Sequence, residues 1–151
     1  MTDIETRDNE LHWDVFVTPG IPYESLDLPP GTQQRMWSPM AATLIYGERD
    51  AVLVDTFMTI EQAHALGEWV EAHGRHLTTI YATHGHGDHF FGASTVLERF
   101  PRARFVATPD VVKIMRQQAS PQSLASFWNP VFPRSDFRSS RHCGRTDRKR
   151  D

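Results

Sequence analysis

An alternation of β-prone and helical segments between residues 51 and 115 most constrains the fold. The β-prone runs lie at 51–55, 77–82 and 104–107, and a stretch with apolar residues at helical spacing follows each of them. Strands that alternate with helices in this way usually form parallel β-α-β units. The pattern therefore predicts an α/β layered fold.

The expected helices have recognisable starts. Thr59 and Gln62 fit a capping box, in which each side chain accepts a backbone N–H near the helix start, and Gly74 is a suitable stop. Thr108 followed by Pro109 is typical of a second start, and a third helix is expected from residue 93. The chain before residue 51 predicts a strand at 12–17, a Pro- and Gly-rich loop at 18–39, and a hairpin of 43–46 with 51–55. After Ser120, three prolines predict a loop.

Composition limits the class of protein. The chain has 151 residues, 39% of them hydrophobic, which suits one soluble globular domain. The single cysteine, Cys143, excludes an intrachain disulfide and a CxxC-type zinc site. The apolar runs are too short for a transmembrane helix, and the acidic, polar start is unlike a signal peptide. We therefore expect no membrane partner and a cytoplasmic location. The four tryptophans are expected to be core or groove residues.

Charge divides the chain unevenly. Residues 134–151 carry seven basic and three acidic side chains, against a net charge of −3 for the whole chain. This tail has Phe137 as its only large apolar side chain, so we expect it to be disordered. A basic tail can contact nucleic acid, but no aromatic residues or helical spacing support binding here, and a solvated end is favoured. The predicted organisation is a mobile N-terminus at 1–10, a domain at 11–133 and the basic tail.

The segment with the chemistry is residues 84–89, here called the motif loop. Three imidazoles and one carboxylate alternate with glycines in six residues: His84, His86, Asp88 and His89. In an extended chain residues 84, 86 and 88 would share a face, and the glycines allow the loop to curl and gather all four side chains. Imidazole and carboxylate groups are good zinc ligands. Since the loop follows a predicted strand, where α/β proteins usually place their sites, we predict a divalent metal site.

Two other interpretations of the motif loop fit its residues less well. A flexible surface loop would account for one incidental histidine, but not for four ligand-type residues interleaved with glycine after a strand. A phosphate-binding glycine loop would need the GxxxxGK[ST] pattern, which is absent, and clustered imidazole and carboxylate groups suit a cation better than an anion.

The motif loop resembles the HxHxDH signature of the metallo-β-lactamase-fold hydrolases, and the resemblance covers about residues 36–116. It implies a four-layered αβ/βα sandwich. It also implies that His84 and His86 bind a first zinc, that Asp88 and His89 bind a second, and that Asp88 orients the nucleophile. The chemistry shared by that family is hydrolysis of small molecules, in which a metal-activated water attacks an ester, thioester, amide or phosphoester.

Two residues refine what the resemblance implies. His86 stands where flavodiiron reductases of similar fold have a carboxylate that suits iron, so an imidazole there favours zinc hydrolase chemistry. Asp55, at the end of a predicted strand, is expected either to orient a metal ligand or to end the strand as a turn residue.

The second half departs from the family pattern. Complete members supply a third histidine, a bridging aspartate and a last histidine from that half, whereas here only His142 follows His89, with no apolar strand before it. His142 is therefore a weak candidate for the third ligand. We expect only the first half of the sandwich, which holds at most one zinc well and leaves apolar faces open to self-association. The alternative function is a truncated, catalytically impaired metal-binding fragment or a non-enzymatic binding module.

Overall fold

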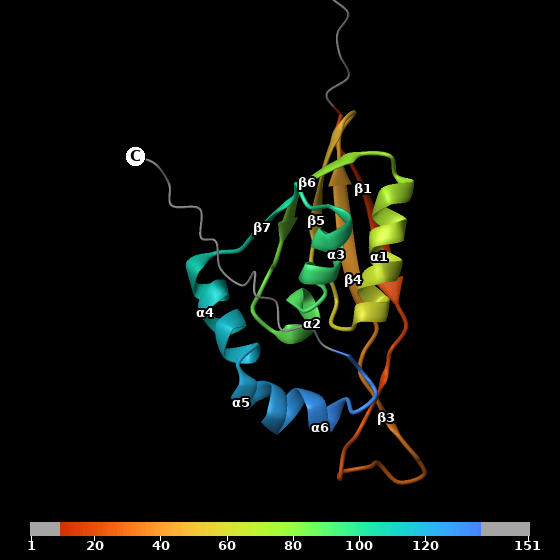
Figure 1. The fold of residues 1–151 in the computed structure, drawn as a ribbon. Helices are drawn as coiled ribbons and strands as arrows, with labels where there is room; N and C mark the ends of the chain where they lie inside the picture. Colours follow the sequence, from red (N-terminus) through yellow and green to blue (C-terminus); the bar gives the residue numbers. More distant parts are fainter. Residues whose placement is uncertain (1–9, 137–151) are drawn as a thin grey trace, which may run out of the picture.

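The computed structural model describes residues 10–136 and is built around a five-stranded sheet (Figure 1). The strand order is β1-β4-β5-β6-β7. β1, β4 and β5 pair antiparallel, whereas β5, β6 and β7 pair parallel. The strands are β1 (His12–Thr18), β4 (Met40–Tyr46), β5 (Asp50–Val54), β6 (His76–Tyr81) and β7 (Arg104–Val106). The predicted strands, the hairpin and the parallel units are thus confirmed.

Two helices cover one face of this sheet, α1 (Ile60–Ala72) and α3 (Ala93–Arg99) (Figure 1). The predicted capping box of α1 is present: Thr59 Oγ1 accepts the Gln62 N–H at 3.1 Å, and Gln62 Oε1 accepts the Thr59 N–H at 3.2 Å. Gly74 follows the helix with φ +62°, a left-handed conformation that favours glycine. Between helices and sheet lies the first core, which includes Leu44, Leu53, Leu66, Val70, Ile80 and Val96.

The segment after Ser120 is helical, so the predicted loop is wrong. α4 (Pro109–Gln118) leads into α5 (Pro121–Ser123), a π-helical turn (Leu124–Trp128) and α6 (Asn129–Val131). Ser120 Oγ accepts the Ser123 N–H at 3.1 Å, and Pro121 occupies the first helical turn, where no N–H is needed. We call residues 109–132 the helical arc, which runs below the sheet in Figure 1.

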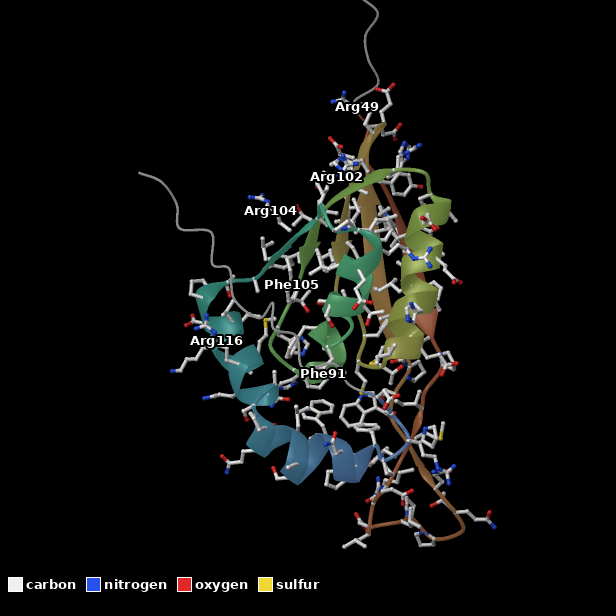
Figure 2. All side chains as sticks on the ribbon, in the orientation of Figure 1. Arg49, Phe91, Arg102, Arg104, Phe105 and Arg116 are labelled. Carbon is white, nitrogen blue, oxygen red and sulfur yellow. The ribbon has the colours of Figure 1, made fainter. Side chains whose placement is uncertain are left out.

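A second core fastens the helical arc to the loops at the carboxyl ends of the strands. Trp128 and Phe132 are 2% and 1% exposed. They pack with Phe91, which follows the motif loop, and the Phe91 and Trp128 ring centroids lie 5.0 Å apart; Phe91 is labelled in Figure 2. Tertiary burial of these aromatic residues therefore outweighs the prolines that predicted a loop.

The opposite face of the sheet carries mostly apolar side chains, exposed on β1 and for the most part half-buried on the inner strands. Its register places Trp13 beside Ile45, and aligns Val15, Thr43, Val54, Tyr81 and Val106 across the five strands. Trp13 is 71% exposed and Val17 62% exposed, so Trp13 lies outside the core, although the sequence predicted a core or groove position for it. The described residues thus form a helix layer and a sheet layer, half of the expected αβ/βα sandwich. The strands β2 (Pro22–Tyr23) and β3 (Arg35–Met36) form a separate small sheet.

The ends of the described region bear on three predictions. Residues 1–9 and 137–151, which include most of the predicted mobile N-terminus and basic tail, with His142 and Cys143, lie outside it. Within it, Asp136 still contacts the domain, because its carbonyl oxygen accepts the Ile60 N–H at 3.3 Å. Of the helices between residues 10 and 136, none has both the length and the apolar character needed to cross a membrane.

Candidate metal centre

The motif loop lies at the carboxyl end of β6, and a short helix begins inside it. α2 spans Gly87–Phe90, and His86 is the residue immediately before it, with extended backbone at φ −78° and ψ 144°. This helical turn carries Asp88 and His89 back toward His84. The loop therefore curls as the glycines allow, and the extended arrangement, with residues 84, 86 and 88 on one face, does not occur.

Three of the four predicted ligands come together. One ligand atom from each of His84, Asp88 and His89 lies within 4.8 Å of the others, and all three side chains are half-buried. The His84 and His89 ring centroids are 3.7 Å apart, and His89 Nε2 lies 3.7 Å from Asp88 Oδ2. Ligand atoms around a tetrahedral zinc lie about 3.3 Å apart, given Zn–N distances near 2.0–2.1 Å. The three ligand atoms are thus near one another but farther apart than in a formed zinc site.

His86 lies beside this group but not in it. Its ring centroid is 4.9 Å from that of His84, in an edge-on arrangement, and the residue is exposed.

Glycine is required in the motif loop for close packing. A Cβ on Gly85 would lie 2.5 Å from Ile114 Cβ and 2.8 Å from the Val111 carbonyl oxygen, both on α4. A Cβ on Gly87 would overlap the Phe91 ring and come within 2.7 Å of Trp128. The helical arc therefore presses directly on the loop backbone, and only glycine leaves space for this contact.

Asp55 lies behind the site and contacts His89. It follows β5 with φ +65° and is 7% exposed, and its Oδ2 accepts the His89 Nδ1–H at 2.8 Å. Its carboxylate also accepts the Thr83 backbone N–H at 2.8 Å. A carboxylate on Nδ1 fixes the ring and leaves Nε2 for a metal. Of the two roles considered for Asp55, the geometry favours the orientation of a ligand.

Thr83 extends this network to the second imidazole, and sequence reasoning missed it. Its hydroxyl lies 2.8 Å from Asp55 Oδ2 and 3.2 Å from His84 Nδ1. A hydroxyl has one proton, so a Thr83 hydroxyl that donates to Asp55 accepts from His84 Nδ1–H. Nε2 is then the nitrogen that each imidazole has left to bind a metal. Its position directly before the motif was the only sequence signal for this role.

Burial and charge shift the pKa values of the two imidazoles in opposite directions. Burial lowers the pKa of His84, and the neighbouring His89 and His86 lower it further. Burial also opposes protonation of His89, but the hydrogen bond and negative charge of Asp55 outweigh it and raise the pKa of His89. In the metal-free site, His84 is therefore harder to protonate, and His89 easier to protonate, than an ordinary imidazole.

Trp37 is the second residue that sequence reasoning missed. Its indole Nε1 lies 3.4 Å from Asp88 Oδ2, although the two residues are 51 positions apart in the chain. The sequence analysis placed all four tryptophans in the core or in grooves, and no motif around Trp37 distinguishes it from the other three.

The chain resembles known proteins in sequence. Residues 36–142 match the metallo-beta-lactamase superfamily. Over 70 residues the chain is 37% identical to a hydroxyacylglutathione hydrolase from Synechococcus sp. (strain CC9902), covering 46% of this chain and 26% of that protein.

Two solved metallo-beta-lactamases resemble part of this chain. The metallo-beta-lactamase SMB-1, bound to 2-mercaptoethanesulfonate, is 28% identical with a TM-score of 0.46, over 56% of this chain and 33% of that one. The metallo-beta-lactamase FIM-1 from Pseudomonas aeruginosa, in its mono-zinc form, is 16% identical with a TM-score of 0.48, over 71% of this chain and 42% of that one. The chain spans about a quarter of the length of the curated relative. Because the family match covers well over half of its residues, the chain belongs to the metallo-beta-lactamase superfamily.

Proposed function

We propose that this chain is a zinc-dependent hydrolase whose metal is held by His84, Asp88 and His89, with His86 as a further ligand. The observation that carries the proposal is the convergence of three ligand atoms within 4.8 Å at the carboxyl end of β6. Membership of a superfamily of hydrolases supports the reaction type.

The donor set fits zinc. Two or three imidazoles with one carboxylate are borderline ligands that suit zinc, and catalytic zinc sites keep three protein ligands and one open position. The network from Asp55 through Thr83 leaves Nε2 of both His84 and His89 free to bind. Zinc in such a site supplies Lewis-acid activation of a water molecule.

The chain's own residues then place the reacting groups. Asp88 is the proposed catalytic residue, because a carboxylate oxygen beside the two imidazoles can accept a hydrogen bond from the attacking water and orient it. Asp55 accepts the Nδ1–H of His89 and so holds this ring with Nε2 available to the metal, and its burial at 7% exposure keeps that interaction strong.

We propose a small acyl ester or thioester as the substrate class, with amides and phosphoesters as further classes. The 37% identity over 70 residues to a hydroxyacylglutathione hydrolase supports the thioester in particular. The experiment compares the zinc-loaded chain with its His84→Ala variant in thioester hydrolysis, with free thiol measured by a chromogenic disulfide. His64→Ala is the matched control, because His64 is an exposed imidazole on α1.

The proposal expects hydrolysis that a chelator abolishes, that zinc restores, and that His84→Ala lowers while His64→Ala does not. Equal rates in all three proteins, or rates that are insensitive to chelation, would contradict it.

A second candidate function is a metal-binding fragment with impaired catalysis. It is favoured by the number of ligands, since the described residues bring together three ligand groups, enough for one ion and not for two. If this function is correct, zinc will bind without turnover, so the two functions differ in the hydrolysis assay and agree in the binding assay.

We also propose that the exposed sheet face allows self-association with a second copy of the chain.

A further inference from the structure

Asp88 receives a hydrogen bond from outside the motif loop. Its side chain is 14% exposed, so the carboxylate has lost most of its contact with water. The Trp37 indole Nε1–H points to Oδ2 at 3.4 Å, and the same oxygen lies 3.7 Å from His89 Nε2. One carboxylate oxygen is thus shared between the indole and the cluster of imidazoles.

The indole is held in this position by its own surroundings. The Trp37 backbone N–H donates to the Ile21 carbonyl oxygen at 2.8 Å, next to the small sheet of β2 and β3. Its ring centroid lies 5.8 Å from that of Tyr23 and 5.2 Å from that of Phe132, both in edge-on arrangements. A Cβ on Gly20 would overlap the Trp37 carbonyl oxygen, so the backbone on the facing segment also fits closely around this residue. The donor is therefore pre-positioned by packing.

We propose that Trp37 is a positioning residue for the metal site, which holds Asp88 in the rotamer that presents Oδ2 to His84 and His89. This inference rests on the proposed function, because it assigns to Trp37 an effect on zinc affinity. A tryptophan indole donates one hydrogen bond and accepts none, so it can pair only with an acceptor such as the Asp88 carboxylate oxygen. Without the indole N–H, Asp88 would be free to adopt other rotamers, at an entropic cost when zinc binds.

A purely structural role is the alternative, in which the Trp37 ring only fills space between Tyr23, Trp128 and Phe132. The two roles use different parts of the side chain. Trp37→Phe keeps an aromatic ring in the cluster and removes the N–H, so it separates them. Trp13→Phe is the matched control, because Trp13 is 71% exposed on the far face of the sheet.

The first experiment measures the zinc dissociation constant by competition with a chromophoric chelator. Loss of a group that orients a metal ligand typically weakens metal binding 10–100-fold. We expect Trp37→Phe to weaken zinc binding by about tenfold, Trp13→Phe to leave it unchanged, and Trp37→Phe to have no further effect once Asp88→Ala is present. Equal affinities for Trp37→Phe and wild type, or an equal loss in the Asp88→Ala background, would overturn the proposal. Failure of the wild-type chain to bind zinc would instead overturn the proposed function.

The second experiment tests the contact without any metal. In the metal-free chain, the Trp37 indole N–H proton resonance is compared between wild type and Asp88→Asn by NMR. We expect this resonance to move when the carboxylate charge is removed, while the Trp13 resonance stays in place. An unmoved Trp37 resonance would show that the indole does not bind Asp88, whatever the zinc affinity.

Discussion

Asp55 Oδ2 accepts the Nδ1–H of His89 at 2.8 Å, and this pair links the end of β5 to the motif loop after β6. Carboxylate–imidazole pairs of this kind fix the ring tautomer and strengthen the metal ligand, so their loss typically weakens metal binding 10–100-fold. Asn tolerates the left-handed backbone at this position, φ +65°, so Asp55→Asn removes the negative charge without straining the backbone. We predict that Asp55→Asn weakens zinc binding by at least about tenfold in a chelator competition assay.

The chain provides its own control for this prediction. Asp50 makes a similar pair with His76 Nδ1 at 3.2 Å, but both side chains are exposed at 58% and 51%. Asp50→Asn should leave zinc affinity unchanged. If the two variants lose affinity equally, the effect is a general one of charge, and Asp55 has no special role.

The pKa shifts predict two different imidazole titrations in the metal-free chain. By NMR, His89 should titrate above the ordinary value of 6.5 and His84 below it. Because the pKa of His89 is raised on folding, its pair with Asp55 contributes stability that is fully present below pH 6.5 and is lost as pH rises through the folded pKa. The pKa of His84 is instead lowered on folding. Its neutral form therefore contributes stability that is present above pH 6.5 and is lost as pH falls through the folded pKa. A His89 that titrates at or below 6.5 in the wild-type chain would contradict the assignment.

Packing of the helical arc on the motif loop gives a prediction about stability. The Cβ added by Gly85→Ala would lie 2.5 Å from Ile114 Cβ, and overpacking of this kind typically costs about 1–3 kcal/mol. We predict a loss of that size in the free energy of unfolding, measured by urea denaturation. Gly47→Ala is the control, since its nearest neighbour would be Leu11 Cδ2 at 3.7 Å, an ordinary contact. Equal stability of the two variants would show that α4 does not press on the loop.

The exposed sheet face gives a prediction about association. Trp13 and Val17 are 71% and 62% exposed on this face, so we expect the 17.3 kDa chain to form larger species as its concentration rises. The double variant Trp13→Lys, Val17→Lys should return it to the monomer mass in light scattering after size-exclusion chromatography. Leu26→Lys alters a fully exposed side chain in the 18–39 segment and should not have this effect. A wild-type chain that stays monomeric at every concentration would exclude this association.

Local signals in the sequence predicted the fold well, and long-range contacts explain what they missed. The capping box of Thr59 and Gln62 lies within four residues, so pattern alone could find it. The helical segment at 121–131 is not predicted, because prolines usually break a helix, whereas burial of Trp128 and Phe132 favours a helical backbone there.

In the candidate site too, the sequence predicted the local features and not the long-range contacts. The motif loop is contiguous, and its ligand character was evident from residue type and spacing. Its partners come from elsewhere: Asp55 is 34 residues from His89, and Trp37 is 51 residues from Asp88. The end of a predicted strand made Asp55 a candidate, but only the fold shows that it contacts His89. Nothing in the sequence distinguishes Trp37 from the other tryptophans, so its contact with Asp88 is seen only in the fold.

The most direct measurement of the central claim is X-ray absorption at the zinc edge of the chain loaded with one equivalent of zinc. If the motif loop holds the ion, the spectrum will show at least two imidazole ligands at about 2.0–2.1 Å with an oxygen ligand. It will lose imidazole scattering in His84→Ala and in His89→Ala. A zinc surrounded by oxygen atoms alone, or a spectrum that neither variant changes, would contradict the assignment of this site.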